Sequence, residues 1–153
     1  MANTQPSGIQ IASGNLSSLT NAHTTAIELI AAPGASKLIL VHFVFIYIKN
    51  GTTPWTGIGN AWLVYGTAGN DQVNMASALM TNVIQGGTAS TNYIAGQAGS
   101  IGSDWLGDTT ATTQRITSAN SLNQPVSFTC SSAPADGNGS VGWKIWYSII
   151  APT

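Results

Sequence analysis

The sequence contains very little charge. Of its 153 residues, four are Lys or Arg and five are Asp or Glu, which is 6% of the chain where about 25% is usual. Four basic residues cannot match a run of phosphates, so we expect neither nucleic acid nor an anionic membrane surface as a partner. With a net charge of −1, a free monomer would have weak electrostatic protection against association. The low charge therefore predicts that other subunits cover part of the surface.

Cysteine and histidine are scarce as well, and this limits the possible chemistry. A single cysteine, Cys130, excludes an intramolecular disulfide and leaves a cysteine-based metal site without ligands. We interpret it as a small buried residue, because no activating charge lies near it in the sequence. His42 stands within an apolar run and is interpreted as half-buried and hydrogen-bonded. The chain has no nucleophile-elbow, phosphate-loop or dinucleotide motif, so we expect no enzymatic activity, no cofactor and no metal.

Long hydrophobic segments are also missing. The most apolar run, residues 38–48, is interrupted by His42 and is too short for a membrane-spanning helix. The first eight residues have neither a basic start nor an apolar core, unlike a secretory signal peptide. We therefore expect synthesis in a cytoplasm and no membrane partner.

One carboxylate pair has more than one interpretation. Asp104 and Asp108 flank residues 105–107 in a Gly-, Ser- and Thr-rich stretch. Two carboxylates in a loop could perform glycosidase chemistry or bind Ca²⁺. They could equally be solvated turn residues that accept backbone N–H bonds, and this is the interpretation that we favour.

What the chain does have is a series of short β patterns. The expected strands are residues 8–12, 24–31, 37–49, 60–65, 72–84, 112–118, 125–130 and 141–151. Residues 72–84 also fit a helical stripe, and the strand is favoured because the context is β. Residues 37–49 are apolar on both faces, which is typical of a strand that is covered on both sides.

Two turn signals separate these strands. Pro33-Gly34 predicts a type II turn with a positive φ at Gly34. Residues 136–139, Asp-Gly-Asn-Gly, predict a hairpin with a positive φ at Gly139. Short strands, frequent turns and the absence of a long helical pattern predict an all-β, single-domain antiparallel β-sandwich or jelly roll over residues 13–153.

An extended N-terminal arm, residues 1–12, is expected to precede this domain. Pro6 and Gly8 oppose a helix, while Ile9 and Ile11 alternate with polar residues. This pattern suits a strand that is added to a neighbouring subunit. The alternative is a first strand that completes the sheet of its own domain.

Two tryptophans in predicted loops are the other candidate contact residues. Trp55 follows the longest strand, and Trp105 lies in the Gly-rich stretch. An exposed ring there could stack on a sugar or anchor a protein contact. The alternative for Trp55 is a lid packed over one end of the sandwich.

Several stretches, in order, resemble small virion proteins of tailed phages and prophages. Residues 31–37, Ala-Ala-Pro-Gly-Ala-Ser-Lys, resemble the APGAGK start of that family, and residues 51–66 resemble its TTPYT…LxxxYG stretch. Residues 123–126, Asn-Gln-Pro-Val, resemble its NQPL element. Residues 137–149 resemble its closing GDGTL…VYY hairpin. The resemblance implies a non-enzymatic β-sandwich in the virion and brings no catalytic residues.

Two functions are compatible with these observations. The first is a capsid decoration, or cement, protein that binds the major capsid protein and associates with copies of itself, which we expect to form a trimer. The second is a tail or receptor-binding component with a carbohydrate-binding β-sandwich.

Overall fold

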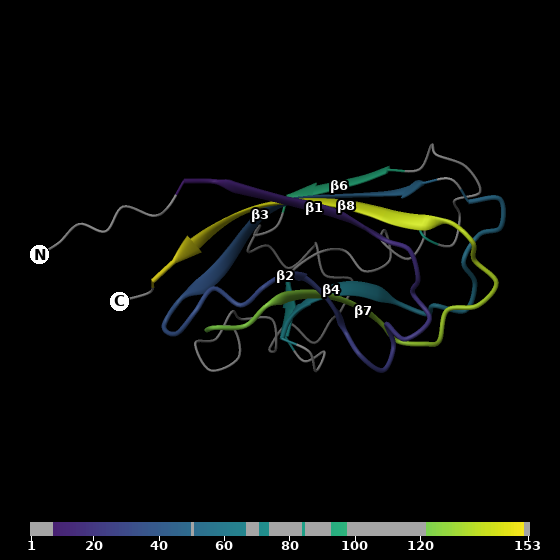
Figure 1. Ribbon diagram of the computed structural model, residues 1–153, viewed down its shortest axis with the longest axis horizontal. Coiled ribbons are helices and arrows are strands. Elements are labelled where there is room, and N and C mark those ends of the chain that lie inside the picture. The colour runs from purple at the N-terminus through teal and green to yellow at the C-terminus, as the bar shows by residue number, and fades with distance from the viewer. Residues whose placement is uncertain are drawn as a thin grey trace, which may run out of the picture.

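A computed structural model describes residues 8–49, 51–66, 71–73, 84, 93–97 and 122–151. These residues form two antiparallel sheets of four strands that lie one above the other (Figure 1), which confirms the predicted all-β fold. Within the described part of the chain, no helix is long and apolar enough to span a membrane. The strands are β1 (Gln10–Leu16), β2 (Ile27–Ile30), β3 (Leu38–Lys49), β4 (Ala61–Tyr65), β5 (Asp71–Val73), β6 (Tyr93–Gln97), β7 (Val126–Cys130) and β8 (Ser140–Ile150).

The order of the strands follows one rule. Strand β1 pairs with β8, β2 with β7, β3 with β6 and β4 with β5, and all of these pairs are antiparallel. Two further pairings, β3–β8 and β4–β7, complete the orders β1-β8-β3-β6 and β2-β7-β4-β5. Among the described strands, successive pairs therefore lie alternately in the two sheets.

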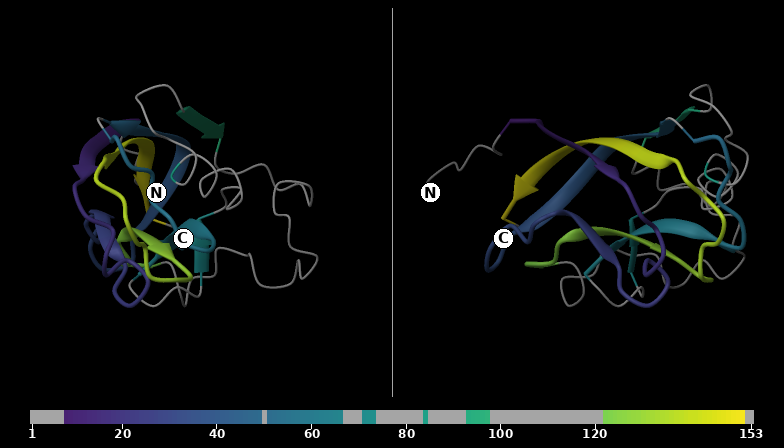
Figure 2. Two further views of the ribbon diagram at one scale, coloured as in Figure 1. Left: turned by 90° about the vertical axis from the view of Figure 1, so that its right-hand side faces the viewer. Right: turned by 45° about the vertical axis from the view of Figure 1, so that its right-hand side comes forward.

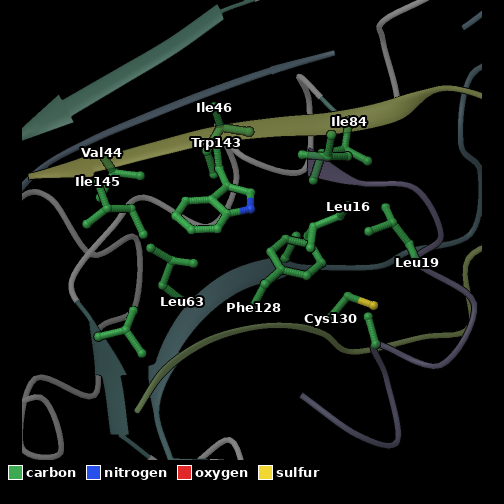
Figure 3. Close-up of a cluster of buried hydrophobic side chains, with 14 of the residues drawn as sticks. Leu16, Leu19, Val44, Ile46, Leu63, Ile84, Phe128, Cys130, Trp143 and Ile145 are labelled. Atoms are coloured by element: carbon green, nitrogen blue, oxygen red, sulfur yellow. The ribbon is translucent and has the colours of Figure 1, made fainter. Parts of the chain in front are cut away.

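The core lies between the two sheets and is almost entirely aliphatic and aromatic. Val44 and Ile46 of β3 and Ile145 of β8 are essentially inaccessible to solvent and face Leu63 and Phe128 of the other sheet (Figure 3). Their alternation with more exposed residues is the period of two that a strand imposes. Burying a side chain of this size stabilises the fold by about 1.5–3 kcal/mol.

A single tyrosine joins the two sheets by a hydrogen bond. Tyr65 ends β4, and its buried hydroxyl donates to the backbone carbonyl of Ile39 in β3 at 2.6 Å. Burial raises the pKa of Tyr65 above its ordinary value, so the phenol stays protonated and remains a donor. The bond satisfies a polar group of each sheet inside an apolar core.

Two pairs of loops hold the ends of the sandwich. At one end, residues 31–37 meet residues 122–125: Asn123 Oδ1 accepts from the Gly34 N–H at 3.0 Å, and the Asn123 N–H donates to the Lys37 carbonyl at 2.7 Å. At the opposite end, residues 51–57 meet residues 135–139 (Figure 1). Asn138 Oδ1 accepts from the N–H groups of Thr52 and Thr53 at 2.9 and 3.0 Å. Each end of the sandwich is thus closed by a contact between two loops that lie far apart in the sequence.

Most predicted strands are present within a few residues of their predicted bounds. The positive φ of Gly34, 100°, is confirmed. Strand β6 was not predicted and falls where an apolar island in a loop was expected. The predicted strand at 112–118, and most of 72–84, lie outside the described residues.

The predicted hairpin at residues 136–139 is wrong. Strands β7 and β8 belong to different sheets, so residues 131–139 cross from one sheet to the other. Gly139 does not have a positive φ; Asp136 does, at 59°. Gly139 instead allows a close approach of two loops, because a Cβ there would lie 3.0 Å from the Gly51 Cα.

The expected arm needs a correction at its inner end. Gln10, Ile11 and Ala12 pair with Tyr147, Trp146 and Ile145 of β8 in the same chain. The boundary drawn at residue 12 therefore falls inside β1, and these residues follow the alternative of a first strand in its own sheet. Residues 1–7 lie outside the described residues.

The tyrosine bond gives a direct test of the fold. Tyr65→Phe should lower the free energy of unfolding by about 1–3 kcal/mol, because it leaves the buried Ile39 carbonyl without its partner. Tyr147→Phe is the matched control, since the Tyr147 hydroxyl has no hydrogen bond among the described residues. Urea denaturation of both variants measures the difference; equal stabilities would contradict the assigned bond.

Candidate interaction surface

The start of β1 and the residue before it expose two large hydrophobic side chains. Ile9 is 66% and Ile11 55% accessible to solvent, and no other large hydrophobic residue in the described ranges is classed as exposed. Along β1 the buried and exposed positions alternate, with Ala12 and Leu16 toward the core and Ile11 away from it. The predicted alternation is confirmed, but here the isoleucines face outward and Gln10 is half-buried.

Ile11 belongs to an apolar row across the outer face of its sheet. It pairs with Trp146 of β8, which in turn pairs with Phe43 of β3. Paired residues of antiparallel strands project from the same face, so the three side chains are neighbours. The Phe43 and Trp146 rings meet edge to face, with centroids 5.1 Å apart and planes at 76°. We call Ile11, Trp146 and Phe43 the apolar row.

One cation and further aromatic side chains border this row. Lys144 Nζ lies 5.1 Å from the centroid of the Trp146 ring, in a cation–π contact. Phe45 and Tyr47 follow Phe43 on the same face of β3, with their centroids 5.6 Å apart. Gly142 leaves room for the Tyr47 ring, which a Cβ at that position would overlap. This surface has no signature in the sequence, because only the strand register brings these residues side by side.

Trp55 is packed as a lid over one end of the sandwich and is not an exposed ring. It is 6% accessible, and its indole N–H donates to the Gly139 carbonyl at 3.2 Å. Its ring lies against Gly137, where a Cβ would overlap the indole. Both faces of the ring are thus unavailable to a sugar. Trp105, Asp104 and Asp108 lie outside the described residues.

His42 and Cys130, the histidine and cysteine considered in the sequence, each have a hydrogen-bond partner in the fold. His42 Nε2 and Ser148 Oγ are hydrogen-bonded at 2.7 Å across β3 and β8, as expected for a half-buried histidine. Burial raises the pKa of the Cys130 thiol to about 11, and its Sγ donates to the Ser132 carbonyl at 3.3 Å. In the ranges that the structure covers, no three His, Cys, Asp or Glu side chains come together as metal ligands.

Comparison of the chain with known protein families, with curated proteins and with solved structures gives no match.

The contact between Trp55 and Gly137 predicts a stability effect. Gly137→Ala should lower the free energy of unfolding by about 1–3 kcal/mol, because the added methyl group must displace the packed indole. Gly8→Ala is the matched control, since a Cβ there meets nothing within 4 Å. Thermal unfolding followed by circular dichroism compares the two variants. If both melt like the wild type, Trp55 does not pack as described.

The buried thiol predicts slow chemical modification. At about pH 8 the folded protein should react with a disulfide reagent about a hundredfold more slowly than the unfolded chain, because the raised pKa of Cys130 lowers its thiolate fraction and burial blocks access. The rate in concentrated urea serves as the reference. Equal rates in both conditions would mean that Cys130 is exposed.

Proposed function

We propose that this protein is a non-enzymatic structural component of a bacteriophage virion. Its role is that of a capsid decoration protein that binds the major capsid protein and associates with copies of itself. The resemblance of residues 24–66 and 122–150 to small phage virion proteins supports this role.

The apolar row is the observation that carries the proposal. Contiguous apolar side chains on the outside of a sheet are typical of a surface that binds another protein. Ile11, half-buried Trp146 and half-buried Phe43 provide such a surface, and Lys144 contributes one charge beside the Trp146 ring. A chain with nine charged residues must obtain its binding energy mainly from apolar contacts and backbone hydrogen bonds.

The strand order gives further support. We infer a jelly roll from the pairings β1–β8, β2–β7, β3–β6 and β4–β5, because an eight-stranded ribbon folded over two sheets has this order. Jelly rolls occur in viral capsid and lectin domains, so the fold is compatible with a virion role without specifying it. The burial of Trp55 gives no support to the carbohydrate-binding alternative.

Purified phage particles provide the test. Heads and tails separated on a density gradient should contain this protein in the head fraction, together with the major capsid protein. Because the proposed contact is apolar, the bound amount should not fall between about 0.1 and 1 M NaCl, which screens charge pairs.

Two results would contradict the proposal. One is recovery of the protein only with tails, or only in the soluble fraction. The other is quenching of tryptophan fluorescence by simple sugars at micromolar concentration, which would favour the carbohydrate-binding alternative. Non-specific adsorption is controlled with capsid-like particles that lack this protein. When purified protein is added back to them, specific binding should saturate, whereas non-specific adsorption should not.

A further inference from the structure

Strand β1 forms an open edge of its sheet. It pairs with β8 on one side and ends the order β1-β8-β3-β6 (Figure 2, left). In an antiparallel pair, alternate residues direct their N–H and C=O groups away from the partner strand. Among the described residues, no backbone hydrogen bond other than those with β8 reaches residues 10–16. Within the described part of the chain, the outer side of β1 therefore presents donors and acceptors that no other strand pairs.

This edge lacks the features that normally prevent association. Edge strands are usually protected by charged side chains, proline or a bulge. Residues 10–16, Gln-Ile-Ala-Ser-Gly-Asn-Leu, contain no charge and no proline, and their register with β8 is regular. Strand β2, the edge of the other sheet, carries the exposed Glu28 and a register shift between Glu28 and Ile30. One of two neighbouring edges is thus protected and the other is not.

The exposed side chains lie at this unprotected edge. Ile9 and Ile11 project from the outer face, and Ile11 continues the apolar row to the edge. The loop of residues 17–26 leaves the other end of β1 toward β2 (Figure 1), so the N-terminal half of β1 is the accessible part. A strand added there would form backbone hydrogen bonds and cover both isoleucines in the same step.

We propose that the occupant of this edge is the β1 strand of a second copy, paired antiparallel about a two-fold axis. An uncharged strand is compatible with itself, because no like charges meet across the axis. With the two-fold axis at residue 10, in the accessible N-terminal half of β1, Ile9 of each copy lies opposite Ile11 of the other. The β1-β8-β3-β6 sheets of the two copies would then form one continuous sheet of eight strands. This inference specifies the self-association in the proposed function but does not require that the protein be part of a virion.

Such a contact closes at two copies, since each β1 edge is used once. Sedimentation at micromolar concentration should give twice the chain mass of 15.7 kDa, and not the trimer that the sequence analysis expected. Ile11→Lys places a charge beside its own copy and should raise the dissociation constant at least tenfold. Ser132→Lys is the matched control, because it adds the same charge on an exposed loop and should leave the dimer intact. Circular dichroism and thermal melting show whether each variant is folded.

Hydrogen exchange of the wild-type protein tests the same contact without a substitution. Amides of residues 8–16 should exchange more slowly at high than at low protein concentration, whereas those of β2 should not change. Four results would overturn the inference. Sedimentation could show a monomer or a trimer, or a dimer that Ile11→Lys leaves intact. Hydrogen exchange in β1 could also prove independent of protein concentration. A dimer that is absent from phage heads would contradict the proposed function and leave this inference standing. A protein that is a monomer in solution but is bound to phage heads would contradict this inference and leave its place in the virion standing.

Discussion

The pairing of β3 with β8 is the interaction on which the rest of the structure depends. It runs from Leu38 opposite Ile150 to Lys49 opposite Ser140, with one register shift between Val41 and Phe43. Strand β1 adds to one side of this pair and β6 to the other. Its inner face supplies much of the core, and its outer face carries Phe43 and Trp146. A single ladder thus determines both what is buried and which aromatic side chains face outward.

The sequence was sufficient to predict most of the described strands, β6 being the exception, but not how they pair. Period-two patterns located β3 and β8 closely, because long apolar alternation leaves little choice. The Asp-Gly-Asn-Gly stretch was assigned to a hairpin because turn chemistry is local, whereas β7 and β8 enter different sheets through contacts far apart in sequence. Ile9 and Ile11 were identified as contact candidates. That Trp146 and Phe43 lie beside Ile11 could not be predicted, because it depends on the strand register. The position of Trp55 was ambiguous because nothing local in the sequence distinguishes a lid from an exposed ring. In the structure, its ring packs against Gly137 and its N–H donates to the Gly139 carbonyl, so it is a lid.

The same scarcity of charge accounts for several features of the molecule. Loops are held by Asn side chains and backbone groups, as at Asn123 and Asn138. The sheets are joined through the neutral Tyr65 hydroxyl. The exposed contact candidates are isoleucines on an uncharged edge strand. A chain built in this way is stabilised by packing and backbone pairing, and these are also the means by which it can bind other proteins.

The central claim is that the outer face of β1, β8 and β3 is a protein-binding surface of a virion component. Electron cryomicroscopy of intact phage heads tests it most directly. The account predicts density for this two-sheet domain on the capsid, with Ile11, Trp146 and Phe43 covered by the capsid protein or by another copy of this chain. Heads without such density, or a bound domain whose apolar row faces solvent, would contradict it.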